Sequence, residues 1–400
     1  MNMPFEPITI GGIHFKNKII RSATHEGLAD EKGYPLNALT QRYIRLAKGA
    51  VGGIITGYAG VQPDGKSPFY RMLMIDSDDS IPYYQELTKA VHAEGVPIML
   101  QIAHCGRQTR SANTGYTPVA PSAIRDRYYN EETPHELTVD EIEVIIDNFV
   151  NASERAKKAG FDGVQLHAAH GYLLSEFLSP YMNRRSDAWG ESVENRSRIV
   201  LEIISRTKRK LGDFPLWIKM NGYDGRKGGM TIAEAIKIAK LLETAGCSGI
   251  EVSCGVMEDN FYSTRFKAHP ADAILYFDFK FEKIPWPVKK WFRPLLQGMI
   301  RSRKPLHLFN LATAREIKKA ISLHVMAVGG VRNVDDIHEV IDDGGVDLVS
   351  LCKPFLLEPD LIAKFINGKQ EKAKCIDCCY CMMGAEKEST RCYYGKLHGR

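Results

Sequence analysis

Short runs rich in β-branched residues alternate eight times with longer segments of helical periodicity along this sequence. The runs that we predict to be strands are Lys18–Ala23, Gly53–Gly57, Ile98–Ala103, Gly163–His167, Leu216–Met220, Gly249–Ser253, Val325–Val328 and Asp347–Leu351. The predicted helices include Thr138–Lys158, Glu194–Leu211, Ile232–Ala245, Ala314–Ala320 and Val334–Ile341. Such alternation indicates βαβ units and a parallel sheet. We therefore predict an α/β fold, a single (β/α)₈ TIM barrel.

A doubly wound sheet is the rival architecture for the same alternation. Such sheets usually open with a glycine-rich G-x-G-x-x-G turn, and the sequence contains none. The barrel places the chemistry on residues at the carboxyl ends of the strands.

Two segments interrupt the alternation. A barrel assigned to residues 1–366 carries an insertion at about 256–311, after the sixth predicted strand, where two to six residues are usual. Its aromatic residues include Phe261, Tyr262, Phe266, Tyr276, Phe277, Phe279, Phe281, Trp286, Trp291 and Phe292. They form either a small satellite core or a lid over the active site, since loops at that face do both. A charged stretch after Asn367 leads into a cysteine-rich segment, residues 367–400.

Charge and hydropathy limit the partners. The net charge of +5 over 400 residues is mild, and Lys and Arg are not gathered into one stripe, so we expect no nucleic-acid partner. The sequence has no run of eighteen apolar residues, and Met1–Ile10 lacks the pattern of a signal peptide. We expect a cytoplasmic protein with a small-molecule substrate and no membrane partner. The sequence leaves open whether the chain forms a homo-oligomer.

The densest chemical signal is VQLHAAHGYLLSEFLSPYMNRR, residues 164–185. His167, His170 and Tyr172 stand at and just after the end of the fourth predicted strand. Two imidazoles three residues apart can reach one ligand oxygen, and a phenol beside them can deliver a proton. The plainer alternative is a pair of hydrogen-bonded histidines in a polar loop. A zinc site is weaker, because no suitable third ligand follows nearby.

Polar side chains also end other predicted strands. Thr24 ends the first, Gln101 and His104 end the third, and Lys219 ends the fifth. Each alone has an ordinary explanation, such as Lys219 as a buried ion-pair partner. A barrel brings them to one mouth, where together they suit a flat heterocycle with an electron-rich polar edge.

The last two predicted strands end in a phosphate-binding pattern. Gly329 and Gly330 follow the seventh strand, and Cys352 and Lys353 follow the eighth. Backbone N–H groups at these positions commonly hold a phosphate in barrels. Glycines let the backbone approach closely, and Lys353 adds a positive charge.

Three motifs make the sequence resemble the old yellow enzyme family of FMN-dependent NAD(P)H:flavin oxidoreductases over about residues 5–365. The motifs are LQIAHCGR (100–107), VQLHAAHGYLLSEFLSPYMNRRSDAWGES (164–192) and AVGG…DLVSLCKP (327–354). The branch it resembles contains 2,4-dienoyl-CoA reductase and trimethylamine dehydrogenase. The resemblance implies an FMN across the barrel mouth, NAD(P)H as electron donor, and reduction of an activated α,β-unsaturated C=C bond by hydride from flavin N5.

The resemblance also implies roles for single residues. Ala23 and Thr24 would face the flavin pyrimidine and its O4 side, and Tyr58 would contribute backbone. Gln101 would bind the pyrimidine edge, and Lys219 would lie by N1 and the ribityl chain. The residues that would hold the phosphate are Gly329, Gly330, Cys352 and Lys353.

In the same resemblance, His167 and His170 would bind the substrate oxygen, with Tyr172 as proton donor. The chain departs from the family at two of its flavin positions. Ser22-Ala23 stands where Pro-Met is common, and Cys352 stands where Gly is usual. Neither departure abolishes a backbone contact.

Five of the nine cysteines cluster after residue 374. In a chain without a secretion signal, this clustering favours a metal over disulfides. The four that give C-x₂-C-x₂-C-x₁₀-C are Cys375, Cys378, Cys381 and Cys392, which leaves Cys379 spare. Spacing alone leaves a [4Fe–4S] cluster and zinc equally open. The resemblance favours [4Fe–4S], with zinc second and a disulfide knot as the plain alternative.

Three functions stay open. The first is the ene-reductase described above, and the second is a dehydrogenase of an amine or another small donor that passes electrons through the cluster. The third is a non-catalytic flavin-binding barrel with a structural zinc tail. The sequence ends eight residues after Cys392, so we expect a cluster to meet an external carrier such as a ferredoxin or flavodoxin. The basic residues that would steer an acidic carrier are Lys372, Lys374, Lys387, Arg391, Lys396 and Arg400.

Overall fold

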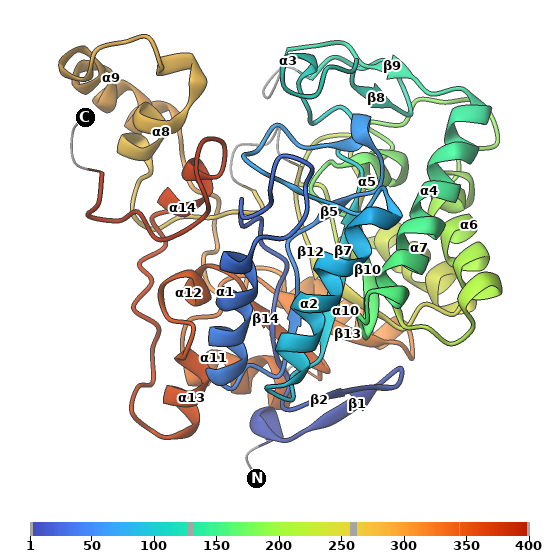
Figure 1. The fold of residues 1–400 in the computed structure, drawn as a ribbon. Coiled ribbons are helices and arrows are strands. Elements are labelled where there is room, and N and C mark those ends of the chain that lie inside the picture. The colour runs from blue at the N-terminus through green and yellow to red at the C-terminus, as the bar shows by residue number, and fades with distance from the viewer. Residues whose placement is uncertain (1–2, 127–130, 257–261, 344, 398–400) are drawn as a thin grey trace.

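The computed structural model describes residues 3–126, 131–256, 262–343 and 345–397. Eight of the described strands form a closed, parallel barrel (Figure 1). In barrel order they are β3 (Ile19–Arg21), β4 (Gly53–Ile55), β7 (Ile98–Ala103), β10 (Gly163–Ala168), β11 (Leu216–Asn221), β12 (Gly249–Ser253), β13 (His324–Val328) and β14 (Leu348–Leu351), which pairs with β3. The predicted TIM barrel is confirmed, with strand ends shifted by one or two residues.

Helices cover the outside of the barrel (Figure 1). The longer ones are α1 (Asn37–Lys48), α2 (Ile81–His92), α4 (Val139–Lys158), α6 (Val193–Leu211), α7 (Ile232–Thr244) and α10 (Leu311–Ala320). Helix α4 begins where the sequence predicts it, because Thr138 and Glu141 form a reciprocal capping box. The last predicted helix is shorter: α11 (Val334–His338) continues as a π-helical turn, Glu339–Asp343.

A hairpin at the start of the chain closes the lower end of the barrel. Strands β1 (Ile8–Ile10) and β2 (Ile13–Phe15) pair antiparallel, and the side chains of Ile10, Ile13 and Phe15 join a cluster with Trp217 and Met326 of the barrel strands. The hairpin is absent from the sequence-based prediction. Only the opposite end, where the strands have their carboxyl ends, is left for a site.

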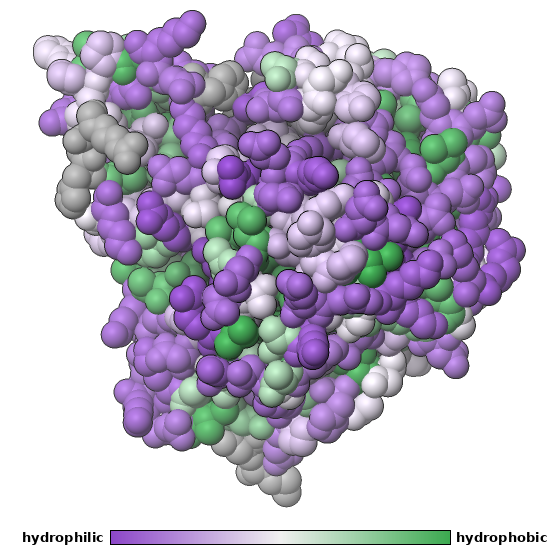
Figure 2. All heavy atoms as spheres, viewed as in Figure 1, coloured by the Kyte–Doolittle hydropathy of each residue, from purple (hydrophilic) through white to green (hydrophobic). Residues whose placement is uncertain are grey.

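The described part of the insertion after β12 includes two α-helices, α8 (Ala271–Phe277) and α9 (Trp286–Met299), with a 3-10 turn at Phe279–Phe281 between them. Helix α8 packs against the cysteine-rich segment in a satellite core that joins Ala273 and Phe277 to Tyr380 and Tyr393. Helix α9 lies outermost in a lobe beside the barrel (Figures 1 and 2), and its Trp291 is 86% exposed. Of the predicted aromatic residues, Phe261 lies outside the described part of the chain. The satellite core agrees with one of the two alternatives for the insertion.

The cysteine-rich segment runs along the barrel mouth. The backbone N–H of Ala373 donates to Arg332, Lys267 donates to the carbonyl of Asp377, and Thr390 donates to Glu26. Three short helices belong to this end of the chain: α12 (Lys353–Leu357), α13 (Leu361–Ile366) and α14 (Tyr380–Gly384). The division at residue 366 stays a prediction. Within the described residues, no helix has the length and apolar character needed to cross a bilayer.

Candidate active site at the barrel mouth

The end of β10 gathers two imidazoles and two phenols. The ring centroids of His167 lie 5.2 Å from His170 and 4.7 Å from Tyr172. The hydroxyl of Tyr172 lies 3.3 Å from that of Tyr58, which comes from the loop after β4. His170 adopts a left-handed backbone conformation, with φ of 64°, directly after the strand. This turn brings residues 167, 170 and 172 to one place, as the spacing in the sequence predicts.

Hydrogen bonds orient both imidazoles. His170 Nε2 lies 2.7 Å from the hydroxyl of Ser253, and its backbone N–H donates to the side chain of Asn221. The backbone N–H of Ala169 donates to His167 Nδ1. Because Nδ1 accepts, the neutral tautomer of His167 carries its proton on Nε2.

Burial keeps this cluster neutral at physiological pH. Desolvation, with the nearby charges of His170 and Lys219, holds the pKa of His167 well below its usual value. Desolvation and the charge of Lys219 lower the pKa of His170 to about 3. Desolvation also raises the pKa of the Tyr172 phenol. The cluster therefore offers neutral N–H and O–H donors.

We expect the unfolding free energy to fall as pH drops below about 6.5. The folded-state pKa values of His167 and His170 lie below the unfolded value, so the unfolded chain takes up protons first. Each histidine lowers stability by up to about 1.4 kcal/mol per pH unit between those two values. Urea unfolding at pH 7 and pH 5 measures the effect. The variant His170→Gln should show a smaller difference, and an unchanged difference would contradict the assignment.

A buried polar network lies one layer deeper in the barrel. Gln101 Nε2 donates to Gln165 Oε1 at 2.7 Å, and Gln165 Nε2 donates to Glu251 Oε2 at 2.9 Å. Lys219 Nζ lies 3.2 Å from Glu251 Oε1 and 2.9 Å from the hydroxyl of Ser22. These side chains come from five different barrel strands or strand ends, so the barrel fold assembles the network.

This network adds Gln165 and Glu251 to the residues found from the sequence. Lys219 is in an ion pair, which is the ordinary explanation considered for it. Burial alone would raise the pKa of Glu251, but Lys219 and the hydroxyls of Ser350 and Ser22 hold it below the usual range. The sequence signal for Glu251 was a lone charge inside the apolar strand GIEVS.

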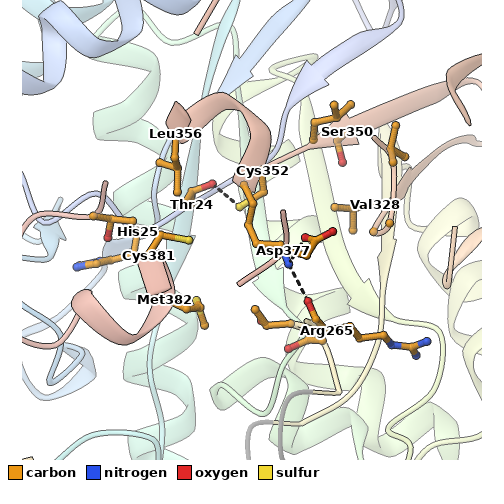
Figure 3. A pocket seen from close by; sticks show the side chains of 18 of the residues that line it. Thr24, His25, Arg265, Val328, Ser350, Cys352, Leu356, Asp377, Cys381 and Met382 are labelled. Carbon is orange, nitrogen blue, oxygen red and sulfur yellow. Dashed lines mark hydrogen bonds and ion pairs between the residues drawn. The ribbon is translucent and has the colours of Figure 1, made fainter. Parts of the chain in front are cut away.

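A pocket extends from the end of β3 to the ends of β13 and β14 (Figure 3). The empty space inside it, open solvent included, is about 890 Å³. Thr24 and His25 line one end, and Thr24 Oγ1 lies 2.9 Å from Cys352 Sγ. Figure 3 shows Cys381 and Met382 on the side of His25, opposite Val328 and Ser350. Ala23 packs instead against the barrel interior.

The other end of the pocket is basic. Gly329, Gly330, Arg332 and Lys353 line it together with Asp377. Gly329 has φ of 117°, and a Cβ there would lie 2.6 Å from the ring of Phe309, so glycine is required. The structure thus brings together the ends of β13 and β14 that the sequence predicts to hold a phosphate.

Asp377, from the cysteine-rich segment, lies between Arg332 and Lys353, two of the three cations that line this pocket; the third is Arg265. Its carboxylate accepts from Arg332 Nε at 2.7 Å and pairs with Lys353 Nζ at 2.7 Å. Arg332 and Lys353 hold its pKa below the usual value despite burial. Sequence reasoning missed several residues of the pocket, and the charged or imidazole ones among them are His25, Arg265, Arg332 and Asp377. The sequence offered a signal for two of them. His25 follows the first predicted strand, and Arg332 follows the two glycines after the seventh.

The predicted cluster ligands do not form a metal site in this structure. Among the described residues, no three His, Cys, Asp or Glu side chains are arranged to hold a metal ion. Burial raises the pKa of Cys375, and it raises that of Cys378 to about 11. Cys379 is buried, with Sγ 3.5 Å from Lys353 Nζ. The cysteine segment therefore contributes to the basic end of the pocket, and its metal stays a prediction.

Comparison with known proteins agrees with this geometry. Residues 4–258 match the model of the NADH:flavin oxidoreductase / NADH oxidase family. The chain belongs to this family. The resemblance to old yellow enzyme is thereby confirmed, and the family is one of flavin oxidoreductases. FMN and NAD(P)H fit the family.

Individual relatives extend the match along the chain. An NADH oxidase of Thermoanaerobacter brockii is 35% identical over 98% of this chain and 55% of its own length. An NADPH dehydrogenase of a Geobacillus species is 38% identical over 89% of this chain and 92% of its own length. A solved complex of 2-naphthoyl-CoA reductase is 26% identical, with a TM-score of 0.79, over 96% of this chain and 55% of its own. This family member thus spans about half the length of the first and third of these relatives.

Proposed function

We propose that this chain is an FMN-dependent oxidoreductase that uses NAD(P)H to reduce an activated C=C bond. The observation that carries the proposal is the neutral cluster of His167, His170 and Tyr172 at the carboxyl end of β10. Neutral donors of this kind stabilise negative charge that develops on a substrate oxygen. The family membership supports the flavin and the nicotinamide donor.

The residues of the mouth fit an FMN. The pocket from Thr24 to Lys353 combines an apolar lining with a basic end that suits a phosphate. Gly329, Gly330, Cys352 and Lys353 would hold the phosphate, whereas Thr24, Gln101 and Lys219 would lie toward the ring system. Tyr58 would complete the ring site together with the backbone of Ala23, whose side chain packs into the barrel interior. A bound FMN would supply the hydride acceptor for NAD(P)H and the hydride donor for the alkene.

The chain's own groups would position the substrate and move the proton. His167 Nε2–H and His170 would donate to the carbonyl oxygen conjugated with the alkene and stabilise the charge that develops there. As hydride reaches the β-carbon, Tyr172 Oη would give its proton to the α-carbon. Tyr58 Oη, 3.3 Å from Tyr172 Oη and 3.3 Å from the hydroxyl of Ser67, would return a proton from solvent.

Anaerobic stopped-flow absorbance tests the proposal. The flavin should be reduced by NADH or NADPH and then reoxidised by 2-cyclohexenone. The opposite arm mixes oxidised protein with trimethylamine and an artificial acceptor. Reduction by the amine, together with no reoxidation by the enone, would overturn the proposal in favour of the dehydrogenase alternative.

The [4Fe–4S] cluster and an acidic electron carrier stay proposals of their own, supported by cysteine spacing and the family resemblance. Iron, sulfide and zinc analysis of anaerobically purified protein distinguishes the two metals. Of the basic residues expected to steer a carrier, Arg400 lies outside the described part of the chain.

We expect Asp377→Asn to strengthen FMN binding by about tenfold. In the chain as it stands, the Asp377 carboxylate occupies the two cations that would bind the phosphate, so its negative charge opposes the phosphate. Quenching of FMN fluorescence by the apoprotein measures the dissociation constant. The matched control is Asp187→Asn, which removes a carboxylate that pairs with Arg185 away from the pocket. Weaker FMN binding in Asp377→Asn would show that Asp377 positions the cations instead.

A further inference from the structure

A second pocket lies between β3, α1 and α12, on the outer side of the barrel wall. The empty space inside it, open solvent included, is about 720 Å³. Four arginines line it: Arg21, Arg42, Arg45 and Arg391. The remaining wall is apolar, apart from Cys352, and includes Leu46, Phe355 and Leu356. Cys352 and Leu356 line both this pocket and the proposed FMN pocket.

The positive charge of this pocket is only partly balanced. Among the described residues, none of those that line it is acidic. Glu26 lies near, and its Oε1 accepts from Arg21 and from the hydroxyl of Tyr43, whereas its buried Oε2 has no hydrogen-bond partner among the described residues. Its single negative charge faces the charges of Arg21, Arg42 and Arg45. Glu388 pairs with Arg391 at 3.2 Å, where both side chains are largely exposed and the pair is weak.

Arg42 and Arg45 have no counter-ion in the described part of the chain. The Nη1 atom of Arg42 is buried and has no hydrogen-bond partner there. Burial lowers the pKa of Arg42, and the charges of Arg21 and Arg45 lower it further, although Glu26 opposes them. A buried guanidinium donor without an acceptor is costly. The arrangement is therefore one that an added anion would stabilise.

Three independent parts of the fold hold these arginines together. Arg42 and Arg45 are three residues apart on α1 and so share one helix face. Arg21 is fixed from β3 by its bonds to the carbonyls of Ile55 and Thr24. The cysteine-rich segment delivers Arg391, because the backbone N–H of the preceding residue, Thr390, donates to the carbonyl of Glu26 at 2.8 Å.

We propose that this arginine pocket binds a phosphate group, either as inorganic phosphate or as a phosphate monoester. Guanidinium groups match phosphate with paired N–H donors. The apolar wall formed by Leu46, Phe355 and Leu356 would receive the organic part of an ester. The site adjoins the proposed flavin phosphate site, with which it shares Cys352 and Leu356, but the cations differ, because Arg332 and Lys353 line only the flavin pocket. The inference goes beyond the proposed function and does not depend on it.

Isothermal titration of the FMN-loaded protein, freed of excess FMN by gel filtration, in a phosphate-free, low-salt buffer tests the site. FMN saturation keeps the flavin phosphate site filled, and a chain that takes up no FMN would count against the proposed function alone. Inorganic phosphate and 5′-AMP are titrated separately, which distinguishes the free anion from the ester. We expect one saturable site for at least one probe, weakened at least tenfold in Arg42→Gln/Arg45→Gln.

The matched control is Lys48→Gln on the same helix. Lys48 is 64% exposed, pairs with Glu94 and does not line the pocket. The control should bind within twofold of the unaltered chain. The proposal is overturned if neither probe binds at 10 mM, if the double variant binds as tightly as the unaltered chain, or if Lys48→Gln loses as much affinity as the double variant.

A second measurement needs no variant and so avoids any loss of folding. Phenylglyoxal modifies accessible arginines, and mass spectrometry reports the rate at each position. The preferred probe should slow modification of Arg45 and Arg391 at least fivefold and leave Arg198, on α6, unchanged. Equal protection of Arg198, or no protection at the pocket, would overturn the proposal.

Discussion

Replacing Tyr172 by Phe is expected to slow reoxidation of the reduced flavin by an enone by about 10²- to 10⁴-fold, the usual contribution of a positioned proton donor. Reduction of the flavin by NAD(P)H should change less than twofold, because hydride transfer from the nicotinamide needs no proton from this phenol. The ring itself would remain, with its packing against His167 at 4.7 Å and Tyr58 at 5.4 Å. Anaerobic stopped-flow absorbance measures the two half-reactions separately.

The matched control for this prediction is Tyr58→Phe. Tyr58 is a second buried phenol in the same cluster, bonded to Tyr172, and we assign it only the return of a proton. Its loss should slow the enone half-reaction much less than the loss of the Tyr172 hydroxyl. If Tyr172→Phe slows both half-reactions equally, or if Tyr58→Phe has the larger effect, Tyr172 is not the proton donor.

Replacing Lys219 by Met is expected to cost about 3–5 kcal/mol of stability, the usual result of breaking a buried ion pair from one side. Glu251 is fully buried, and Lys219 is its one cationic partner among the described residues. Its remaining partners are the neutral side chains of Gln165, Ser22 and Ser350. Urea unfolding of the apoprotein gives the free energy without any contribution from bound flavin.

The double variant Lys219→Met/Glu251→Gln separates the loss of the pair from the loss of one partner. With both charges removed, no unpaired charge stays buried, so most of the lost stability should return. A double variant as unstable as Lys219→Met alone would contradict the coupling between these two side chains. In that case Lys219 would stabilise the barrel through its packing.

The barrel strands could be read from the sequence because buried parallel strands are short, continuous and β-branched, as in Ile98–Ala103 and Gly249–Ser253. The hairpin of residues 8–15 was missed for a physical reason. Its three-residue strands are stabilised by packing inside the barrel, as for Ile13 and Phe15. Local propensity gives no sign of such a tertiary contact.

The candidate site likewise has a part that the sequence predicted and a part that it did not. Residues 167, 170 and 172 are close in sequence, so one strand end and one turn are enough to bring them together. The partners of Lys219 and Lys353 were not predicted. Glu251 and Asp377 come from elements distant in sequence, and only the closed barrel and the path of the cysteine-rich segment set those contacts.

The central claim is that the barrel mouth binds one FMN, and the visible absorption spectrum of the purified chain tests it most directly. We predict the two absorption bands of an oxidised flavin, and release of one FMN per chain on denaturation, measured by its fluorescence. A colourless protein that takes up no FMN when incubated with an excess of it would contradict the account.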